Sequence, residues 1–190
     1  MKLPIYNCYH PILREKTSDV SDFGEDFQIF AQNMLESMYA ADGIGLAANQ
    51  VGDKRSIVIV DEFAGDDASK HNPIFLVNPK ITHFSDDEVP YREGCLSIPL
   101  FYEEVMRPDK IQVEFQDLDG NPKKIEAGDL LSRVIQHEVD HLNGKLFFDY
   151  LTPLKRAMSK SKLRRIEQGK TQAHYDMIGP NGEEIKASSE

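Results

Sequence analysis

Two histidines and a glutamate stand close together near position 140. In "RVIQHEVDHLNG" (133–144), His137 and His141 are four residues apart, and Glu138 directly follows the first of them. On a helix, residues i and i+4 project from the same face one turn apart, so both imidazoles can reach a single ion. Glu138 then stands beside the remaining coordination position. The spacing indicates metal-assisted hydrolysis.

A catalytic site of this kind needs about three protein ligands, with one position left for water. A protease-like site would take its third ligand downstream, where Glu167 and His174 are the nearest candidates. Both lie in strongly polar segments, which weakens that alternative. Upstream, Cys95 in "REGCLSIPL" (92–100) would complete a Cys-His-His set. Considered alone, Cys95 is better explained as a small buried residue, because free cysteines are often buried.

The segment that carries the histidines is predicted to be a buried helix over residues 128–143. Apolar residues occupy most of its circumference, in the stripes of His137 and of Glu138 alike: Leu130, Leu131, Val134, Ile135, Val139 and Leu142. A helix that is hydrophobic nearly all round is buried. Two histidines and a glutamate are costly there unless they are paired or coordinated. A chance match to the spacing on a surface helix is therefore disfavoured.

The remaining pattern predicts an α+β fold, with antiparallel sheets around the buried metal-binding helix and an N-terminal and a C-terminal helix outside. A helix over 21–42, capped by Ser21 or Asp22 and ended by Gly43, shows one apolar face. Thr152 and Pro153 begin a C-terminal helix that extends to about 168. β-Branched and aromatic runs predict strands at 56–60, 74–78, 80–84 and 110–116, with a turn at 117–121 and a polar surface loop at 62–72.

Length and composition indicate a single catalytic domain over 1–170, followed by a polar tail over 171–190 that we expect to be loosely ordered. The chain has neither a run of about 18 apolar residues nor the apolar core of a signal peptide, so a cytoplasmic protein without membrane contact is expected. Its two cysteines, Cys8 and Cys95, do not suggest a disulfide framework. Cys8 is interpreted as a buried residue without a role.

Charge is unevenly distributed along the chain. The net charge of −10 disfavours nonspecific binding of DNA. Residues 155–170 nevertheless hold seven basic residues and one glutamate, a local charge of +6. This segment is either a docking site for an anionic partner or, more simply, the solvated face of a helix.

Three motifs in order resemble a known family. "GIGLAANQ" (43–50), "EGCLS" (93–97) and "QHEVDHLNG" (136–144) are similar to the signature segments of peptide deformylases. These enzymes remove the N-formyl group from the N-terminal formylmethionine of newly made proteins and release formate. A zincin-like endopeptidase and a structural metal module are the competing classes. The first would need a downstream ligand, and the second gives Glu138 no purpose.

The resemblance implies roles for the residues at matching positions. Cys95, His137 and His141 would bind one divalent ion, with Fe(II) expected and zinc or nickel able to substitute. Glu138 would act as the general base and carry a proton to the leaving amine. The side-chain amide of Gln50 and the backbone N–H of Leu96 would stabilise negative charge on the formyl oxygen.

The resemblance extends to the substrate pocket. Ile44 and Gly45 would contact the substrate, and Leu130 and Val134 would wall a pocket for its methionine side chain, with plain core packing as the alternative. Glu93 would hydrogen-bond a ligand histidine, or it is a surface glutamate. The expected partners are N-formylmethionyl nascent peptides, with a transient ribosome contact through 155–170.

One position departs from the family pattern. Several members have an arginine where this chain has Tyr102, which puts peptide contact there in doubt. Asp140 faces away from the ligands and is expected to pair with Arg107.

Overall fold

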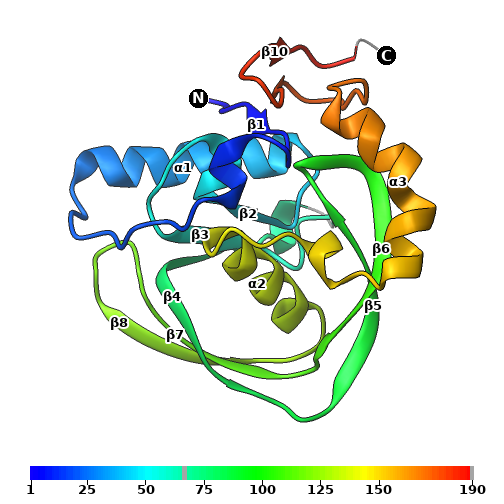
Figure 1. The fold of residues 1–190 in the computed structure, drawn as a ribbon. Coiled ribbons are helices and arrows are strands. Elements are labelled where there is room, and N and C mark those ends of the chain that lie inside the picture. The colour runs from blue at the N-terminus through cyan, green and yellow to red at the C-terminus, as the bar shows by residue number, and fades with distance from the viewer. Residues whose placement is uncertain (66–67, 189–190) are drawn as a thin grey trace.

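The computed structural model describes residues 1–65 and 68–188. Its described part combines three α-helices with antiparallel sheets, which confirms the predicted α+β class (Figure 1). None of the described helices is long and apolar enough to cross a bilayer.

A five-stranded antiparallel sheet forms the centre of the fold. Its strands, in spatial order, are β2 (Gly45–Ala47), β3 (Ile57–Val60), β4 (Ile74–Phe84), β7 (Ile111–Gln116) and β8 (Pro122–Ala127). The two strands expected at 74–78 and 80–84 are one strand, β4. Asn78 adopts a positive φ of 52° at an irregularity in its pairing, a backbone conformation that asparagine tolerates well. The turn expected at 117–121 joins β7 to β8.

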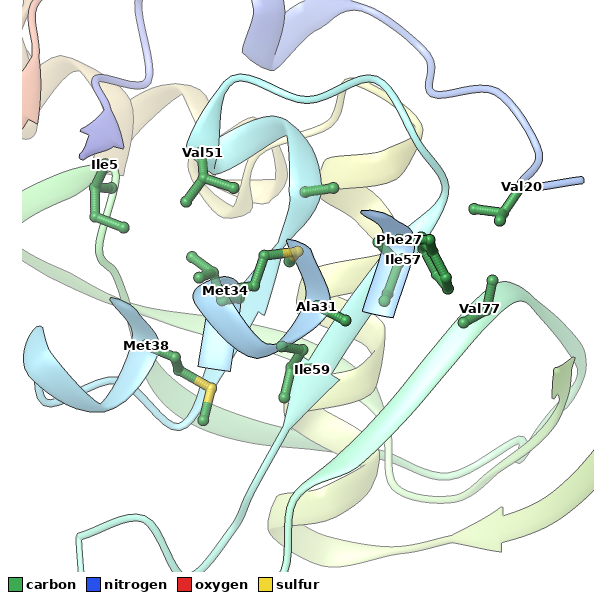
Figure 2. Close-up of a cluster of buried hydrophobic side chains, with 12 residues drawn as sticks. Ile5, Val20, Phe27, Ala31, Met34, Met38, Val51, Ile57, Ile59 and Val77 are labelled. Atoms are coloured by element: carbon green, nitrogen blue, oxygen red, sulfur yellow. The ribbon is translucent and has the colours of Figure 1, made fainter. Parts of the chain in front are cut away.

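Both faces of this sheet are covered, and β3 shows why. All four of its residues are buried. Ile57 and Ile59 belong to the hydrophobic cluster under α1 (Glu25–Ala40), which Figure 2 shows, whereas Val58 and Val60 belong to the cluster around α2 (Asp129–Leu142). A strand covered on both faces reads as a continuous apolar run, as "IVIV" does.

Helix α2 lies at the centre of the molecule, between the five-stranded sheet and a second, two-stranded sheet (Figure 1). Ten of its fourteen residues are buried. The prediction of a buried helix over these residues is confirmed.

The second sheet is a long hairpin of β5 (Glu88–Cys95) and β6 (Ile98–Pro108). Its turn consists of Leu96 and Ser97, and a pairing irregularity lies between Glu93 and Cys95. Sequence analysis did not predict these strands, because proline and glycine interrupt β5 and most of its residues are exposed.

Helices α1 and α3 (Pro153–Glu167) lie on the outside. Helix α1 is shorter than expected: its N-cap is Gly24, and the residue with positive φ that ends it is Asp42 (φ 54°), so the cap assigned to Gly43 was wrong. Helix α3 begins as predicted, with the Thr152 hydroxyl accepting a hydrogen bond from the Lys155 N–H at 3.3 Å. It packs beside β6 through a small buried set, and most of its surface is exposed.

A small three-stranded sheet joins the first strand to the last two. It consists of β1 (Ile5–Tyr6), β9 (Met177–Ile178) and β10 (Glu184–Ile185). Strand β9 runs parallel to β1 and antiparallel to β10. Four residues of the segment expected to be a loosely ordered tail therefore belong to a sheet, Met177–Ile178 and Glu184–Ile185, while positions 189 and 190 lie outside the described residues.

Four short 3-10 helices complete the described elements: Pro11–Arg14, Ala48–Val51, Ala68–Lys70 and Phe147–Tyr150. The third lies in the loop expected at 62–72, of which positions 66–67 are outside the described residues.

Candidate active site

Three potential metal ligands from two distant segments meet at the inner end of the β5–β6 hairpin. Cys95 is the last residue of β5, and His137 and His141 lie on α2. One ligand atom from each residue lies within 4.8 Å of the other two, and Cys95 Sγ is 3.3 Å from His141 Nε2. The structure thus brings together the Cys-His-His set.

The chemistry of these donors fits a divalent cation. Burial lowers the pKa of His141, which keeps its imidazole neutral and able to donate a lone pair. For His137, burial opposes protonation, but hydrogen bonding to Cys95 and Glu93 raises the pKa above its ordinary value. The surroundings therefore favour positive charge between these groups, and a thiolate with two imidazoles suits several transition metals. Of the two downstream alternatives, His174 lies 3.2 Å from Asp42 instead, and neither it nor Glu167 belongs to the cluster of potential ligands.

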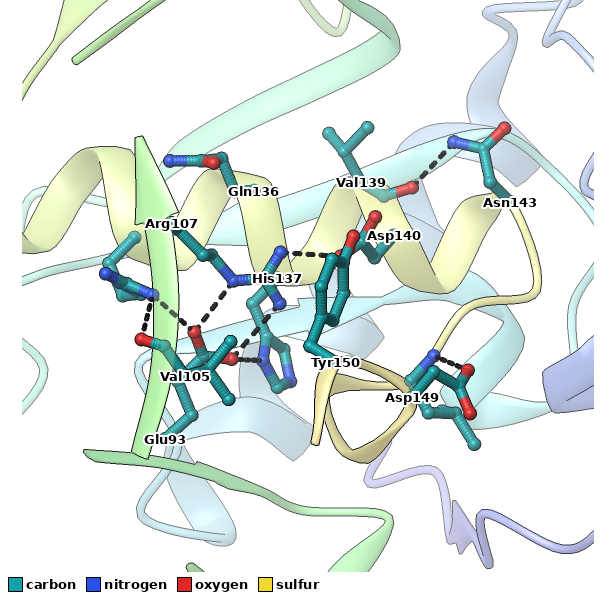
Figure 3. Close-up of polar contacts among 12 residues, drawn as sticks. Glu93, Val105, Arg107, Gln136, His137, Val139, Asp140, Asn143, Asp149 and Tyr150 are labelled. Atoms are coloured by element: carbon teal, nitrogen blue, oxygen red, sulfur yellow. Dashed lines mark hydrogen bonds and ion pairs between the residues drawn. The ribbon is translucent and has the colours of Figure 1, made fainter. Parts of the chain in front are cut away.

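Glu93 is buried and holds the first histidine in place (Figure 3). Its Oε2 lies 2.9 Å from His137 Nδ1, and it also accepts hydrogen bonds from Arg107 Nε at 2.7 Å and Arg133 Nη1 at 2.8 Å. Burial opposes ionisation, but the hydrogen bonds from His137 and Arg107 hold the pKa of Glu93 well below its ordinary value. An ionised Glu93 accepts a hydrogen bond from the protonated Nδ1 of His137. This contact fixes the ring so that its other nitrogen points toward Cys95.

Arg107 connects this network to the end of α2. Its Nη1 donates to Asp140 Oδ2 at 2.6 Å, which confirms the predicted pairing, and the hydroxyl of Tyr150 donates to the same oxygen at 2.9 Å (Figure 3). Sequence analysis missed Arg133, which is 4% exposed. An arginine inside a helix predicted to be buried was the available signal, since such a cation requires an acidic partner.

Glu138 projects toward β2 from the same turn of the helix as His137. It is 4% exposed, and its Oε2 has no hydrogen-bond partner among the described residues. Burial raises the pKa of this carboxyl to about 7. A Cβ at Gly45 would lie 2.6 Å from Glu138 Oε1 and 2.7 Å from Val134 Cγ1, so glycine is the residue that allows β2 to pass here.

Gln50 is buried and held at both ends of its amide. Its Oε1 accepts from the Ala47 N–H at 2.8 Å, and its Nε2 donates to Ser97 Oγ at 3.2 Å while lying 3.5 Å from Cys95 Sγ. The donor nitrogen is thereby aimed at the hairpin turn that carries Leu96. The carbonyl of Leu96 accepts a hydrogen bond from the Tyr175 hydroxyl at 2.7 Å. Sequence analysis missed both hydroxyl residues, although Ser97 lies inside the "EGCLS" motif.

A cavity of about 650 Å³ opens beside these groups. Its lining includes Ile44, Gly45, Leu130 and Val134, which sequence analysis predicted to contact substrate, together with Glu138 and the potential ligands Cys95 and His137. Tyr102 stands half-exposed at the rim, with the Arg92 guanidinium 5.3 Å from its ring centre. The arrangement brings together a set of potential metal ligands, a buried carboxyl group and a cavity in one place.

Comparison with known proteins identifies the family. The sequence profile of polypeptide deformylases matches residues 2–157. The chain belongs to the peptide deformylase family. Peptide deformylases are metal-dependent hydrolases that remove the formyl group from N-terminal formylmethionine, so this chain is an enzyme acting on formylated nascent peptides.

Individual relatives agree over most of their length. A peptide deformylase of Maricaulis maris is 43% identical, over 84% of this chain and 91% of the relative. One from Salinibacter ruber is 38% identical, over 97% of this chain and 98% of the relative. Among solved structures, a plant peptide deformylase has a TM-score of 0.84 at 37% identity, over 88% of this chain and 90% of the other. The enzyme from Legionella pneumophila has a TM-score of 0.81 at 37% identity, over 90% of this chain and 98% of the other.

Proposed function

We propose that Cys95, His137 and His141 together bind one divalent ion, which we expect to be Fe(II), with zinc or nickel able to substitute. The observation that carries this proposal is the convergence of their ligand atoms within 4.8 Å, beside a buried carboxylate and a cavity. In this assignment α2 is the metal-binding helix. A bound divalent cation supplies Lewis-acid chemistry: it polarises the formyl group and lowers the pKa of water.

Glu138 moves the proton. A carboxylate whose pKa lies near 7 can accept a proton from the attacking water and later release it. The position of its carboxyl beside Gly45, on the wall of the cavity, supports delivery of that proton to the leaving amine. Burial also keeps bulk solvent away from the carboxylate during the reaction.

Gln50 and Leu96 stabilise the charge that develops on the formyl oxygen. The Gln50 amide is oriented in advance by Ala47 and Ser97, so no reorganisation is needed when the charge appears. The backbone N–H of Leu96 supplies a second donor at the hairpin turn. Each such donor is typically worth about 3 kcal/mol of transition-state stabilisation.

The substrate occupies the cavity that these groups border. Ile44 and Gly45 contact the peptide, while Leu130 and Val134 accommodate the methionine side chain. Glu93 acts through His137, whose ring orientation it fixes. We expect the enzyme to work in the cytoplasm, where nascent chains become available.

The decisive experiment measures formate release from formyl-Met-Ala by the purified, iron-loaded protein, together with the metal content of Cys95→Ser. We expect formate from the wild type and a sharp loss of bound metal in the variant, because a thiolate ligand is removed. Cys8→Ser is the matched control and should retain its metal. If the iron-loaded wild type releases no formate, the catalytic proposal is refuted. Full metal content in Cys95→Ser would refute the ligand set.

We also propose a transient ribosome contact through helix α3 and the residues that follow it, 155–170. The support is the local charge of +6 on a mostly exposed helix whose Leu154 and Met158 are also exposed. Binding of ribosomal RNA would weaken steeply with salt. Charge reversal at Lys162, Arg164 and Arg165 should reduce co-sedimentation with ribosomes, and unchanged co-sedimentation would refute the contact.

A further inference from the structure

The C-terminal segment after α3 forms part of the active-site cavity. Its contribution to the lining consists of Gln172, Ala173, His174, Tyr175 and Ser188. The deformylase profile ends at residue 157, and the Maricaulis maris relative aligns with 84% of the chain. One wall of the cavity is therefore built by residues outside the part of the chain that the family profile matches.

The segment is anchored to the body of the protein rather than extended into solvent. Met177 is buried and pairs with Ile5 of β1. In Figure 1 the C-terminal part of the chain, with β10, lies near β1 and the N-terminus. The N–H of Ser188 donates to the Ala173 carbonyl at 2.9 Å, which closes the segment on itself. These contacts hold residues 172–175 at the cavity.

Tyr175 connects this segment to the metal-binding hairpin. Its hydroxyl donates to the Leu96 carbonyl at 2.7 Å, one residue from Cys95, and its ring packs against the hydrophobic cluster under α1. Burial raises the pKa of Tyr175, so the phenol remains a donor. Fixing the Leu96 carbonyl restricts the backbone directly after the Leu96 N–H, to which we assign charge stabilisation.

His174 connects the same segment to the loop after α1, which also lines the cavity. Its Nε2 lies 3.2 Å from Asp42 Oδ2. Asp42 directly precedes residues 43–45, and Gly45 lies beside Glu138. Both side chains are substantially exposed, and both residues line the cavity, so this contact lies where the cavity meets solvent. Gln172, also exposed, lies next to it.

We propose that residues 172–175 are a working part of the active site, an inference that rests on the deformylase mechanism proposed above. Tyr175 is a positioning residue that holds the backbone of Leu96, through its carbonyl, for turnover. Gln172 and His174 form a polar rim that contacts the main chain of substrate residues following formylmethionine. The segment thereby contributes to the selection among formylated peptides.

The first test compares Tyr175→Phe with Tyr39→Phe in the full-length, metal-loaded enzyme. Tyr39 is the control, because its hydroxyl also donates a partly buried hydrogen bond, to Asp61 at 2.6 Å, and neither of these residues lines the cavity. One neutral hydrogen bond corresponds to roughly a five- to tenfold effect. We expect kcat for formyl-Met-Ala to fall by about that factor in Tyr175→Phe, with unchanged KM and metal content, and to stay within about twofold in Tyr39→Phe.

A merely structural role for Tyr175 predicts a different result: both variants would melt at lower temperature, and kcat per folded, metal-loaded enzyme would stay at the wild-type value. That outcome overturns the positioning role. Because the wild type is measured in the same assay, an active wild type beside an unaffected Tyr175→Phe refutes this inference alone and leaves the proposed function standing.

The second test addresses the rim through substrate length. In His174→Ala, we expect the ratio of kcat/KM for formyl-Met-Ala-Ala-Ser to that for formyl-Met-Ala to fall about threefold or more, because the longer peptide loses a polar contact. His83→Ala, an exposed histidine on β4, is the control and should keep the wild-type ratio. An unchanged ratio in His174→Ala overturns the rim assignment.

Discussion

Replacing Glu93 with glutamine should weaken both the fold and the metal site, although the side chain keeps its shape. In the native protein each carboxylate oxygen accepts two hydrogen bonds. Oε1 receives Arg107 Nε and Arg133 Nη1, and Oε2 receives Arg107 Nη2 and His137 Nδ1. An amide retains one oxygen and places an NH₂ group where the other stood.

Either orientation of the amide loses contacts. If its NH₂ replaces Oε1, it meets two guanidinium donors. If it replaces Oε2, it meets one guanidinium and the Nδ1 of His137, which must then give up its proton to accept. That second outcome moves the imidazole proton to Nε2 and removes the lone pair needed by a metal. Two charge-assisted hydrogen bonds are lost and buried positive charge is left less compensated, which costs about 3–5 kcal/mol.

The expected consequences are measurable in the metal-free and the metal-loaded protein. A loss of about 3–5 kcal/mol lowers the melting temperature of a domain of this size by roughly 6–20 °C. Zinc affinity, measured by competition with a chromogenic chelator, should fall about 10- to 100-fold. Glu104→Gln is the control, since Glu104 forms an exposed ion pair with Lys155 at 3.7 Å and should shift the melting temperature by about 2 °C or less. A Glu93→Gln protein that melts like the wild type and binds zinc equally well would refute the reasoning.

Three further outcomes follow from the same site. Glu138→Ala should release formate at least about 100-fold more slowly, because the group that transfers the proton is removed. It should retain its metal and its melting temperature, because the carboxyl group it loses is buried with one unpaired oxygen. Wild-type turnover in this variant would exclude Glu138 from proton transfer. Gly45→Ala should lower kcat/KM, since its methyl group would lie 2.6 Å from Glu138 Oε1. Gly65→Ala is the control: a methyl group there would have no described atom within 4 Å, so the variant should behave as wild type. In metal-free protein at pH 8, iodoacetamide should label Cys95 before Cys8, because Cys8 is buried and burial raises the pKa of its thiol; mass spectrometry that finds Cys8 labelled first in the folded protein would contradict this.

Local patterns predicted much of the architecture. The apolar circumference of "DLLSRVIQHEVDHL" identified α2 as a buried helix, and Thr152-Pro153 located the start of α3. The end of α1 was misplaced because aspartate at position 42 adopts the left-handed conformation that is more usual for the following glycine. The β5–β6 hairpin was not anticipated, because its strands are stabilised by pairing with each other and against α2 rather than by their own propensity.

The sequence by itself determined that His137, Glu138 and His141 share one turn of a buried helix, because that relation depends only on helical periodicity. It also placed Cys95 among the candidate ligands, without deciding whether the thiol reaches the histidines. Tertiary structure decided that Cys95 Sγ lies 3.3 Å from His141, that Glu93 is shared by two arginines and a histidine, and that Tyr175 hydrogen-bonds to Leu96. These contacts join segments more than ten residues apart. They depend on the register of the hairpin and the return of the chain end to β1, which no local pattern encodes.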